Sequence, residues 1–416
     1  MKQADNKFAP VEVPDGALYG AETVRCLQNL SCSPFKMSAC PELIEGLAAV
    51  KKAAALANRA AGVIDDSICQ RICAACDQVI GHRHDREFPV DMLHGGGSIA
   101  FNQNMNEVLA SLASAGEDSD VAVCVLDAKV HVNASQSTAD SCATAFRLAI
   151  LIAAADLQAA LSAVIDCLES KSTHYALQLT VARTCLQDAM PVPIASMFTA
   201  WSAGLQRRKE RLSETVGRLK RVNLGGTVIG SGQGAPLAYR EQVVQFLALV
   251  TGKPFVLRDN LYDAAQNADD LGEVSSALCQ LAEMLIKVCA DLRLLSSGPQ
   301  FGFSELKLPA VQNGSSFFAN KNNPVVPETV LQACFHVLGN HRAGQAALEH
   351  AELNLNVFES GLFFHTIQSI SILRSALVLL NDRCLRDLTV NEQLCADMVK
   401  RHAQKQQLET KEISES

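Results

Sequence analysis

The sequence contains few aromatic residues, which make up 5% of its 416 positions and include a single tryptophan. Sandwich-type β folds draw heavily on aromatic and β-branched side chains, so this scarcity argues against them. Alanine, leucine and valine are abundant instead, a mixture that favours packed helices. Because 48% of the residues are hydrophobic and 19% are charged, the chain can bury a large core. Its length predicts two to three domains of about 150 residues each.

An excess of positive charge is also absent. Lysine and arginine number 36 against 44 aspartates and glutamates, which gives a net charge of −8. This balance leaves no electrostatic footprint for nucleic acid and no basic face for a membrane surface. A small anionic substrate held by one or two local charges stays compatible with it.

The N-terminal stretch MKQADNKFAPVEVPDG lacks the apolar segment of a secretory signal peptide. The longest apolar run, Leu148–Ala155, is too short to span a bilayer and is typical of a buried helix. The 15 cysteines therefore indicate reduced thiols and a cytoplasmic location, with no disulfides expected.

Helical spacing of apolar residues dominates the chain. It extends from Pro41 to about Gly81 and then over three longer segments, 140–175, 273–297 and 327–381. Such long segments with short connectors predict an extended all-α bundle, whose apolar faces pack against other subunits. The last fifteen or so residues, HAQKQQLETKEISES, have the composition of a polar tail.

Two groups of potential metal ligands have simpler explanations. Cys69, Cys73 and Cys76 have a spacing used by iron–sulfur enzymes, but the same spacing is one face of an apolar helix. His82 and His84 lack a third ligand nearby, and a solvated turn explains them better. No metal site is therefore expected.

Three polar segments remain as candidates for chemistry. The glycine-rich stretch 224–236 lacks the features of a nucleotide loop and predicts a turn between helices. The loop GSSFFANKNNPVVPE (314–328) combines adjacent hydroxyls with a lysine and asparagines, a set suited to a carboxylate, although an ordinary polar connection fits equally well. Ser137 and Thr138 stand where a long helix begins, a position that favours an anion and also suits a simple helix cap. Thr184 lies in a similar short polar stretch between helices.

Several segments, in this order, resemble the aspartase/fumarase superfamily, and within it the aspartate ammonia-lyases. They are ALYGAETVRCLQNL, HGGGSIAFNQNMNEVLA, HVNASQSTADSCATAFRLAI, ARTCLQDAMP, VNLGGTVIGSG, LRLLSSGPQFGFSELKLP and GSSFFANKNNPVVPE. The resemblance covers roughly Gly16 to Met398, and its most specific part is the last segment.

The resemblance implies a homotetramer whose central domains form a twenty-helix bundle and whose active sites each take residues from three subunits. It divides this chain into an N-terminal domain (1–126), a central bundle domain (127–386) and a vestigial C-terminal segment with a polar tail (387–416). Members of the superfamily perform anti β-elimination on a succinyl compound, usually releasing fumarate, and no cofactor is implied.

The resemblance also assigns roles to individual residues. Ser315 matches the base that removes a proton next to one carboxylate of a C4-dicarboxylate. Ser316, Ser137 and Thr138 match the residues that bind this carboxylate as it becomes the aci-anion. Lys321, Asn323 and Thr184 match the residues that bind the other carboxylate. A free serine is a poor base, so this chemistry requires preorganised positive potential.

The chain departs from the family pattern around the leaving group. Ser98-Ile99 replaces a Gly-Thr pair, Ala139 replaces an asparagine, and Cys185 stands where histidine is frequent; Phe318-Ala319 replaces the Met-Pro of the loop. An ammonium group needs buried acceptors, which Ile99, Ala139 and Cys185 supply poorly. We therefore expect a carbon–nitrogen lyase with a leaving group other than ammonia. The alternatives are a catalytically inactive structural homologue and a fumarase-type hydratase.

Overall fold

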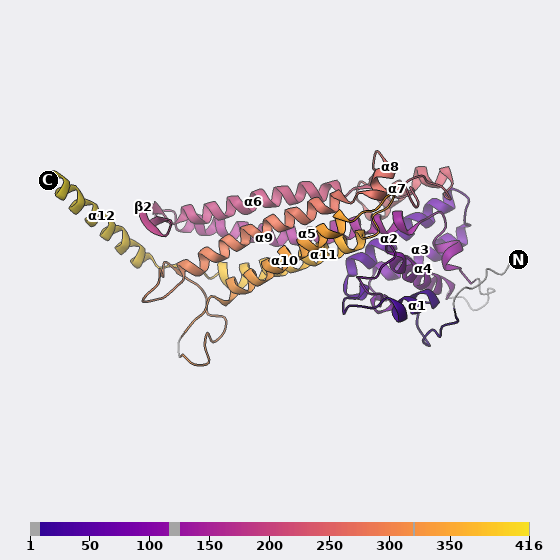
Figure 1. The fold of residues 1–416 in the computed structure, drawn as a ribbon, viewed down its shortest axis with the longest axis horizontal. Helices are drawn as coiled ribbons and strands as arrows, with labels where there is room; N and C mark the ends of the chain where they lie inside the picture. Colours follow the sequence, from indigo (N-terminus) through magenta and orange to yellow (C-terminus); the bar gives the residue numbers. More distant parts are fainter. Residues whose placement is uncertain (1–8, 116–124, 319–320, 416) are drawn as a thin grey trace. The chain divides into compact units, whose positions relative to one another are not determined.

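The computed structural model describes residues 9–115, 125–318 and 321–415 (Figure 1). The chain divides into two compact units, and the divisions fall inside the long helices. The first unit comprises residues 1–153, 215–275 and 342–367, and the second comprises 154–214, 276–341 and 368–416.

Short helices dominate the first unit. The segment predicted to be helical from Pro41 to Gly81 forms two helices, because Asp65 caps the second one by accepting a hydrogen bond from the Ile68 backbone N–H. α2 packs against both α3 and α7. The α-helices that lie wholly within this unit are α1 (Ala21–Asn29), α2 (Pro41–Ala60), α3 (Asp66–Ile80), α4 (Ile99–Ser114), α7 (Leu237–Thr251) and α8 (Leu261–Gln266). A two-residue parallel pair joins β3 (Arg221–Val222) to β4 (Val256–Leu257).

The long helices confirm the all-α prediction. α5 (Thr138–His174) and α9 (Asp269–Leu295) match two of the three predicted segments, and α6 (Ala195–Arg218) is a further long helix. The third segment, 327–381, is wrong as one helix, since α10 (Val325–Glu349) ends before α11 (Glu359–Leu380) begins. Between them Leu353 has a φ of +51°, and Asn356 Oδ1 accepts a hydrogen bond from the Phe358 N–H, which starts the new helix.

A buried ion cluster holds three helices together inside the first unit. The Arg147 guanidinium on α5 donates to Asp270 at the start of α9, at 2.7 and 2.8 Å, and to Glu359 at the start of α11, at 2.8 Å. Burial raises the pKa of the Glu359 carboxyl, and the Arg147 charge opposes that rise. Removing one member of such a cluster leaves uncompensated charge in the interior.

The second unit adds small antiparallel pairs to the long helices. The short polar stretch that contains Thr184 is a β-hairpin, β1 (Leu179–Thr184) with β2 (Gln187–Pro193). Its turn is made by Cys185 and Leu186, both with positive φ, at 51° and 61°. A second pair joins β5 (Leu306–Lys307) to β6 (Thr389–Val390).

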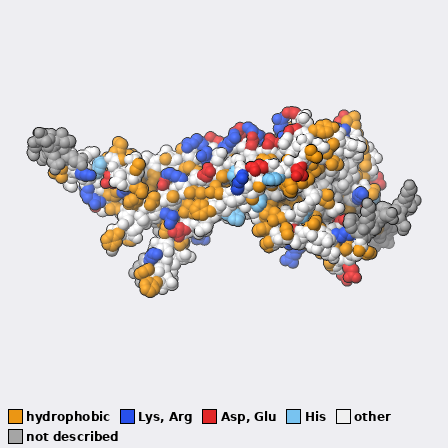
Figure 2. Space-filling model, in the orientation of Figure 1, with side chains coloured by type: hydrophobic (Ala, Val, Ile, Leu, Met, Phe, Trp, Pro, Cys, Tyr) orange, Lys and Arg blue, Asp and Glu red, His pale blue; other side chains and the backbone are white. Residues whose placement is uncertain are grey.

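The C-terminal segment, which the sequence predicts to be a polar tail, is helical. α12 spans Glu392–Glu415, and residues 403–408 are exposed. Charged side chains of both signs cover α6 as well, which Figure 2 shows along the upper edge of the molecule. Both helices therefore present solvated faces in this chain.

Two segments, α5 and Glu359–Leu385, are long and apolar enough to cross a membrane by length and composition. The most apolar stretch of each is about half buried inside the molecule, at 50% and 56%. Core helices of soluble proteins pass the same test, so this is weak evidence for a membrane span.

The glycine-rich stretch 224–236 forms the turn that the sequence predicts. Five of its residues have positive φ: Gly225, Thr227, Gly230, Gly232 and Gly234. At Gly230 an added Cβ would lie 2.3 Å from the backbone carbonyl of Leu261, whereas at Gly234 nothing lies within 4 Å. The backbone of α8 therefore approaches this turn so closely that only glycine fits at position 230.

We predict that Gly230→Ala and Gly234→Ala destabilise the protein to different extents. Both positions have nearly the same φ, 89° and 88°, so both variants bear a similar conformational cost of about 1–2 kcal/mol. Gly230→Ala adds a backbone clash and should lose at least about 2 kcal/mol more. Urea unfolding of the two purified variants measures the difference, and equal losses would contradict this account of the turn.

Candidate active site

Two helices of the first unit begin close to each other. α4 begins at Ile99, directly after Ser98, and α5 begins at Thr138. Asn102 on the first turn of α4 donates from Nδ2 to Thr138 Oγ1 at 3.0 Å, and the Cys142 thiol on α5 donates to the Ser98 carbonyl at 3.7 Å. The structure thus brings the Ser98-Ile99 pair to the Ser137–Ala139 segment.

Ser137 and Asp140 cap the start of α5 reciprocally. The Ser137 hydroxyl oxygen accepts from the Ala139 N–H at 3.2 Å, while Asp140 Oδ1 accepts from the Ser137 N–H at 3.0 Å. Both Ser137 Oγ and Thr138 Oγ1 therefore accept hydrogen bonds from within the chain, and their own hydrogens are left to donate outward. Ser137, Thr138 and Ala139 are only half-buried, so a small molecule can reach them.

Asp140 itself is completely buried. Its second oxygen, Oδ2, accepts from the backbone N–H groups of Gly225 and Thr227, each at 3.0 Å. Burial raises the pKa of this carboxyl, and the three backbone donors together with the Lys51 charge oppose the rise. Asp140 thereby ties the glycine-rich turn to the start of α5, a role that the sequence did not reveal.

A second set of buried polar groups lies behind Thr138. Asn133 Oδ1 accepts from Lys51 Nζ at 2.9 Å, from Asn102 Nδ2 at 3.1 Å and from Asn106 Nδ2 at 3.2 Å. Lys51 has no exposed surface, and this burial lowers the pKa of its ammonium group to about 8. The only signal in the sequence was a lysine at a position where the helical pattern predicts an apolar residue.

The loop with the predicted base belongs to the second unit. Ser315 Oγ accepts from the backbone N–H groups of Phe317 and Phe318, at 3.0 and 2.9 Å. Hydrogen bonds of this kind favour the negatively charged form of the oxygen. Ser315 is half-buried, whereas Ser316, Lys321 and Phe318 are exposed; Ala319, whose replacement of proline was noted above, lies outside the described residues.

Asn323 and Gly314 close this loop. Asn323 Nδ2 donates to the Gly314 carbonyl at 2.7 Å. A Cβ on Gly314 would lie 2.0 Å from the Lys321 carbonyl oxygen, so only glycine permits this approach. The loop therefore holds Ser315 and Lys321 on one short closed segment.

Thr184 and Cys185 lie at the tip of the hairpin in the second unit. Cys185 is exposed, and Thr184 is the last residue of β1. The neighbouring Arg183 anchors the hairpin, because its Nη1 donates to the buried Glu305 at 2.5 Å and its guanidinium lies 4.4 Å from the centre of the Phe303 ring. Among the described residues, no hydrogen bond connects this tip to the loop of Ser315.

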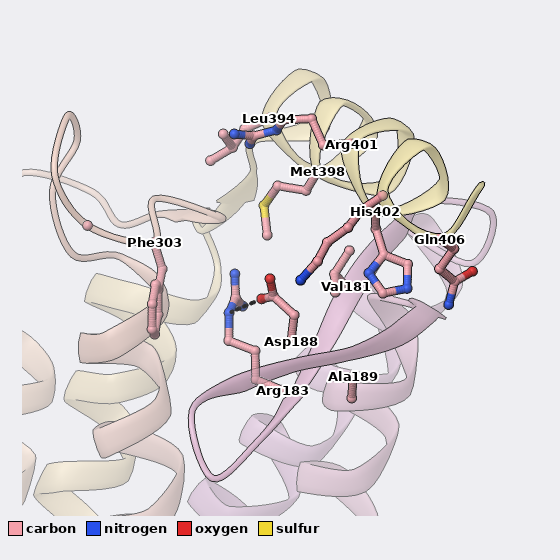
Figure 3. A pocket seen from close by; sticks show the side chains of 12 residues that line it. Val181, Arg183, Asp188, Ala189, Phe303, Leu394, Met398, Arg401, His402 and Gln406 are labelled. Atoms are coloured by element: carbon pink, nitrogen blue, oxygen red, sulfur yellow. Dashed lines mark ion pairs between the residues drawn. The ribbon is translucent and has the colours of Figure 1, made fainter. Parts of the chain in front are cut away.

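A cavity of about 550 Å³ lies beside the same hairpin (Figure 3). Arg183 and Asp188 face each other from its two strands, and Leu394, Met398 and His402 reach the cavity from α12. None of its twelve lining residues is one of the predicted site residues. This cavity is therefore not the candidate active site.

The cysteines of α3 are packing residues. Cys69 and Cys76 are buried, and the Cys69 and Cys73 sulfur atoms lie 4.0 Å apart. Burial raises the pKa of the Cys73 thiol to about 12, so it stays protonated. Within the described ranges, no three histidine, cysteine or acidic side chains form a group that could hold a metal ion.

The chain matches known lyases over most of its length. A family model described as "Lyase" matches residues 10–339. The aspartate ammonia-lyase of Helicobacter pylori (strain J99 / ATCC 700824) is 38% identical over 96% of this chain and 86% of that protein. The aspartate ammonia-lyase of Escherichia coli (strain K12) is 38% identical over 93% and 82%, respectively.

Solved structures agree with these relatives. The fumarate lyase:delta crystallin from Brucella melitensis, solved with cobalt bound, matches with a TM-score of 0.89 and 36% identity over 93% of this chain and 84% of that one. The class II fumarase from Schistosoma mansoni matches with a TM-score of 0.89 and 28% identity over 93% and 85%. The chain therefore belongs to the aspartase/fumarase superfamily and is a carbon–nitrogen lyase of the aspartase type.

Proposed function

We propose that this lyase cleaves a carbon–nitrogen bond of a succinyl compound by anti β-elimination, releasing fumarate and a leaving group other than ammonia. The observation that carries the proposal is the pairing of retained chemistry with a changed pocket. Ser315, Lys321 and Asn323 stand on one closed loop, and Ser137 and Thr138 present hydroxyl donors at a helix start. The leaving-group positions hold Ile99, Ala139 and Cys185 instead, which offer an ammonium group few hydrogen-bond acceptors.

The base in this mechanism is the Ser315 alkoxide. It takes a proton from the carbon next to one carboxylate, and the electron pair of that C–H bond spreads into the carboxylate. The C–N bond then breaks, its electron pair leaves with the nitrogen, and the carbon–carbon double bond of fumarate forms. The backbone N–H groups of Phe317 and Phe318 support this step, because they donate to the oxygen that carries the charge.

Charge also develops on the carboxylate next to the removed proton. Ser137, Thr138 and Ser316 are proposed to bind it, and the free N–H groups and dipole of α5 favour a dianion at the start of that helix. Lys321, with Asn323 and Thr184, is proposed to bind the other carboxylate. Lys321 is exposed in this chain, which agrees with a residue that pairs only when a substrate is bound.

The proposed leaving-group pocket consists of Ile99, Ala139 and Cys185. Ile99 is 47% exposed although it is a large hydrophobic residue, and it lies at the start of α4 near the start of α5. A branched hydrocarbon, a methyl group and a thiol offer an ammonium ion little to bind. They suit a larger or uncharged nitrogen substituent, such as an N-substituted amino group or a nitro group.

We also propose a cytoplasmic homotetramer that shares its active sites among subunits, with the domain limits 1–126, 127–386 and 387–416. About half of the most apolar stretch of α5, whose mean hydropathy is 2.1, is left unburied in one chain. Figure 2 shows hydrophobic side chains at the surface over the long helices, and Phe335 on α10 is 52% exposed. Surfaces of this kind suit an obligate symmetric assembly.

The leaving group can be tested with a panel of substrates. Fumarate release, followed by ultraviolet absorbance, should be fast with one of several N-substituted aspartates or with nitrosuccinate, and slow or absent with L-aspartate and malate. Efficient deamination of aspartate would refute the pocket argument. Dominant conversion of malate would favour a hydratase, and silence on the whole panel would favour an inactive structural homologue.

The base can be tested with Ser315→Ala. We expect turnover to fall at least about a hundredfold while the substrate still binds, since removal of a general base typically costs this much. Lys321→Ala should weaken substrate binding as well as turnover, because a dianion loses its cation. The exposed Ser375 on α11 provides the control, Ser375→Ala, because its hydroxyl donates to the Ser371 carbonyl and to no other group in the described part of the chain. Near-normal turnover in Ser315→Ala would refute the mechanism.

The assembly can be tested by light scattering of the purified protein. One chain has a mass of 44.6 kDa, so a tetramer should appear at about four times this value. Dilution should not release a stable, active monomer, because active sites shared among subunits need neighbouring chains. Full activity in a monomer would overturn both the assembly and the shared site.

A further inference from the structure

The buried polar groups behind Thr138 form a chain of hydrogen bonds with a fixed direction. It begins at Lys51 on α2, passes through Asn133, and continues to Asn102 on α4. Its last bond runs from Asn102 Nδ2 to Thr138 Oγ1 at 3.0 Å. Lys51 is completely buried and Asn102 is 3% exposed, whereas Asn133 and Thr138 are half-buried.

Lysine sets the direction of the chain because an ammonium group only donates. The atom of Asn133 that faces Lys51 must therefore be the carbonyl oxygen Oδ1, not the amide nitrogen. That oxygen in turn requires a donor from Asn102, which places Nδ2 of Asn102 toward it. The second hydrogen of the same Nδ2 then points at Thr138 Oγ1.

This direction determines how the Thr138 hydroxyl can bond. A threonine hydroxyl has one hydrogen to donate, and here its oxygen already accepts from Asn102. The hydrogen is therefore not used on Asn102, and the half-buried Thr138 can offer it to a ligand at the start of α5. A hydroxyl held in this way is a preorganised donor for a carboxylate.

We infer that Asn102 and Lys51 are positioning residues of the active site: they hold the Thr138 hydroxyl as a donor to the substrate carboxylate. The inference rests on the proposed role of Thr138 in carboxylate binding. Neither residue touches the substrate, and neither is assigned a role by the family pattern quoted above. The Thr138 hydroxyl held in this way favours a ligand that accepts hydrogen bonds, such as a carboxylate.

The first test is a double-mutant cycle between Asn102 and Thr138, read out as the dissociation constant of fumarate in titration calorimetry. Thr138→Val removes the hydroxyl, and the lost hydrogen bond to a charged group should weaken binding about 10- to 100-fold. Asn102→Ala should weaken it several-fold in the wild-type background. In the Thr138→Val background it should have no further effect, because no hydroxyl remains to be held.

Asn104 supplies the matched control on the same helix. It is also a fully buried asparagine, but its Nδ2 donates to the Glu87 carbonyl at 2.9 Å, so it serves the fold and not Thr138. Asn104→Ala should lose stability in urea unfolding to an extent similar to Asn102→Ala while fumarate binding stays unchanged. An equal loss of binding in both variants would mean that Asn102 acts only through the fold.

The second test compares binding with stability at Lys51. Lys51→Met keeps a side chain of similar volume but removes a charge that offsets the burial of Asp140, so we expect it to lower stability. Asn133 Oδ1 keeps its other donors, Asn102 and Asn106, so no buried acceptor is left unpaired. We expect lower resistance to urea unfolding together with several-fold weaker fumarate binding, measured where the variant is still folded. The stability-matched Asn104→Ala should keep normal binding, so stability loss alone does not account for the weaker binding. Lys52→Met on the same helix, which breaks an accessible ion pair with Asp77, should leave binding unchanged.

The outcomes distinguish this inference from the proposed function. Unchanged fumarate binding in Thr138→Val would refute the proposed carboxylate site itself. Weaker binding in Thr138→Val with normal binding in Asn102→Ala and Lys51→Met would overturn only the positioning role. Additive effects of Asn102→Ala and Thr138→Val would also overturn it, because they would place Asn102 on a separate path to the ligand.

Discussion

The start of α5 depends on the buried carboxylate of Asp140. A carboxylate without access to water must find hydrogen-bond donors, and Asp140 takes three of them from the backbone, at Ser137, Gly225 and Thr227. Two of these donors, Gly225 and Thr227, are residues of the turn 224–236 that have positive φ. The helix start and the turn are therefore fixed together, and neither can shift without exposing an unpaired charge.

This constraint gives the proposed carboxylate site its rigidity. Asp140 accepts a hydrogen bond from the Ser137 backbone N–H, and Asn102 donates a hydrogen bond to the Thr138 hydroxyl oxygen. The acceptor capacity at this helix start is thus largely used within the protein, while donors remain for a ligand. An anion needs no rearrangement to bind there, which lowers the free-energy cost of stabilising a transient dianion.

Sequence patterns predicted the parts that depend on local periodicity. α5 and α9 appeared at nearly their true limits, and the glycines of 224–236 indicated a turn. The break between α10 and α11 and the hairpin around Cys185 were missed, since both depend on a few positive-φ residues that are not glycine. The loop residues Ser315 and Lys321 were identifiable by resemblance. Asn102, Lys51 and Asp140 act through buried contacts between distant segments, and no local pattern reveals such contacts.

The two halves of the proposed site differ in how freely their side chains can change. Asp140 accepts three backbone hydrogen bonds, and Asn133 accepts hydrogen bonds from the buried Lys51, Asn102 and Asn106. Substitution of either shared acceptor therefore leaves buried donors unpaired. The proposed leaving-group residues are less constrained. Ile99 and Cys185 are exposed and Ala139 is half-buried, so changing their side chains leaves no buried polar group without a partner. A fold built in this way can replace the group that faces the leaving nitrogen at little cost in stability. The elimination chemistry can therefore persist while the nitrogen substituent that it releases changes.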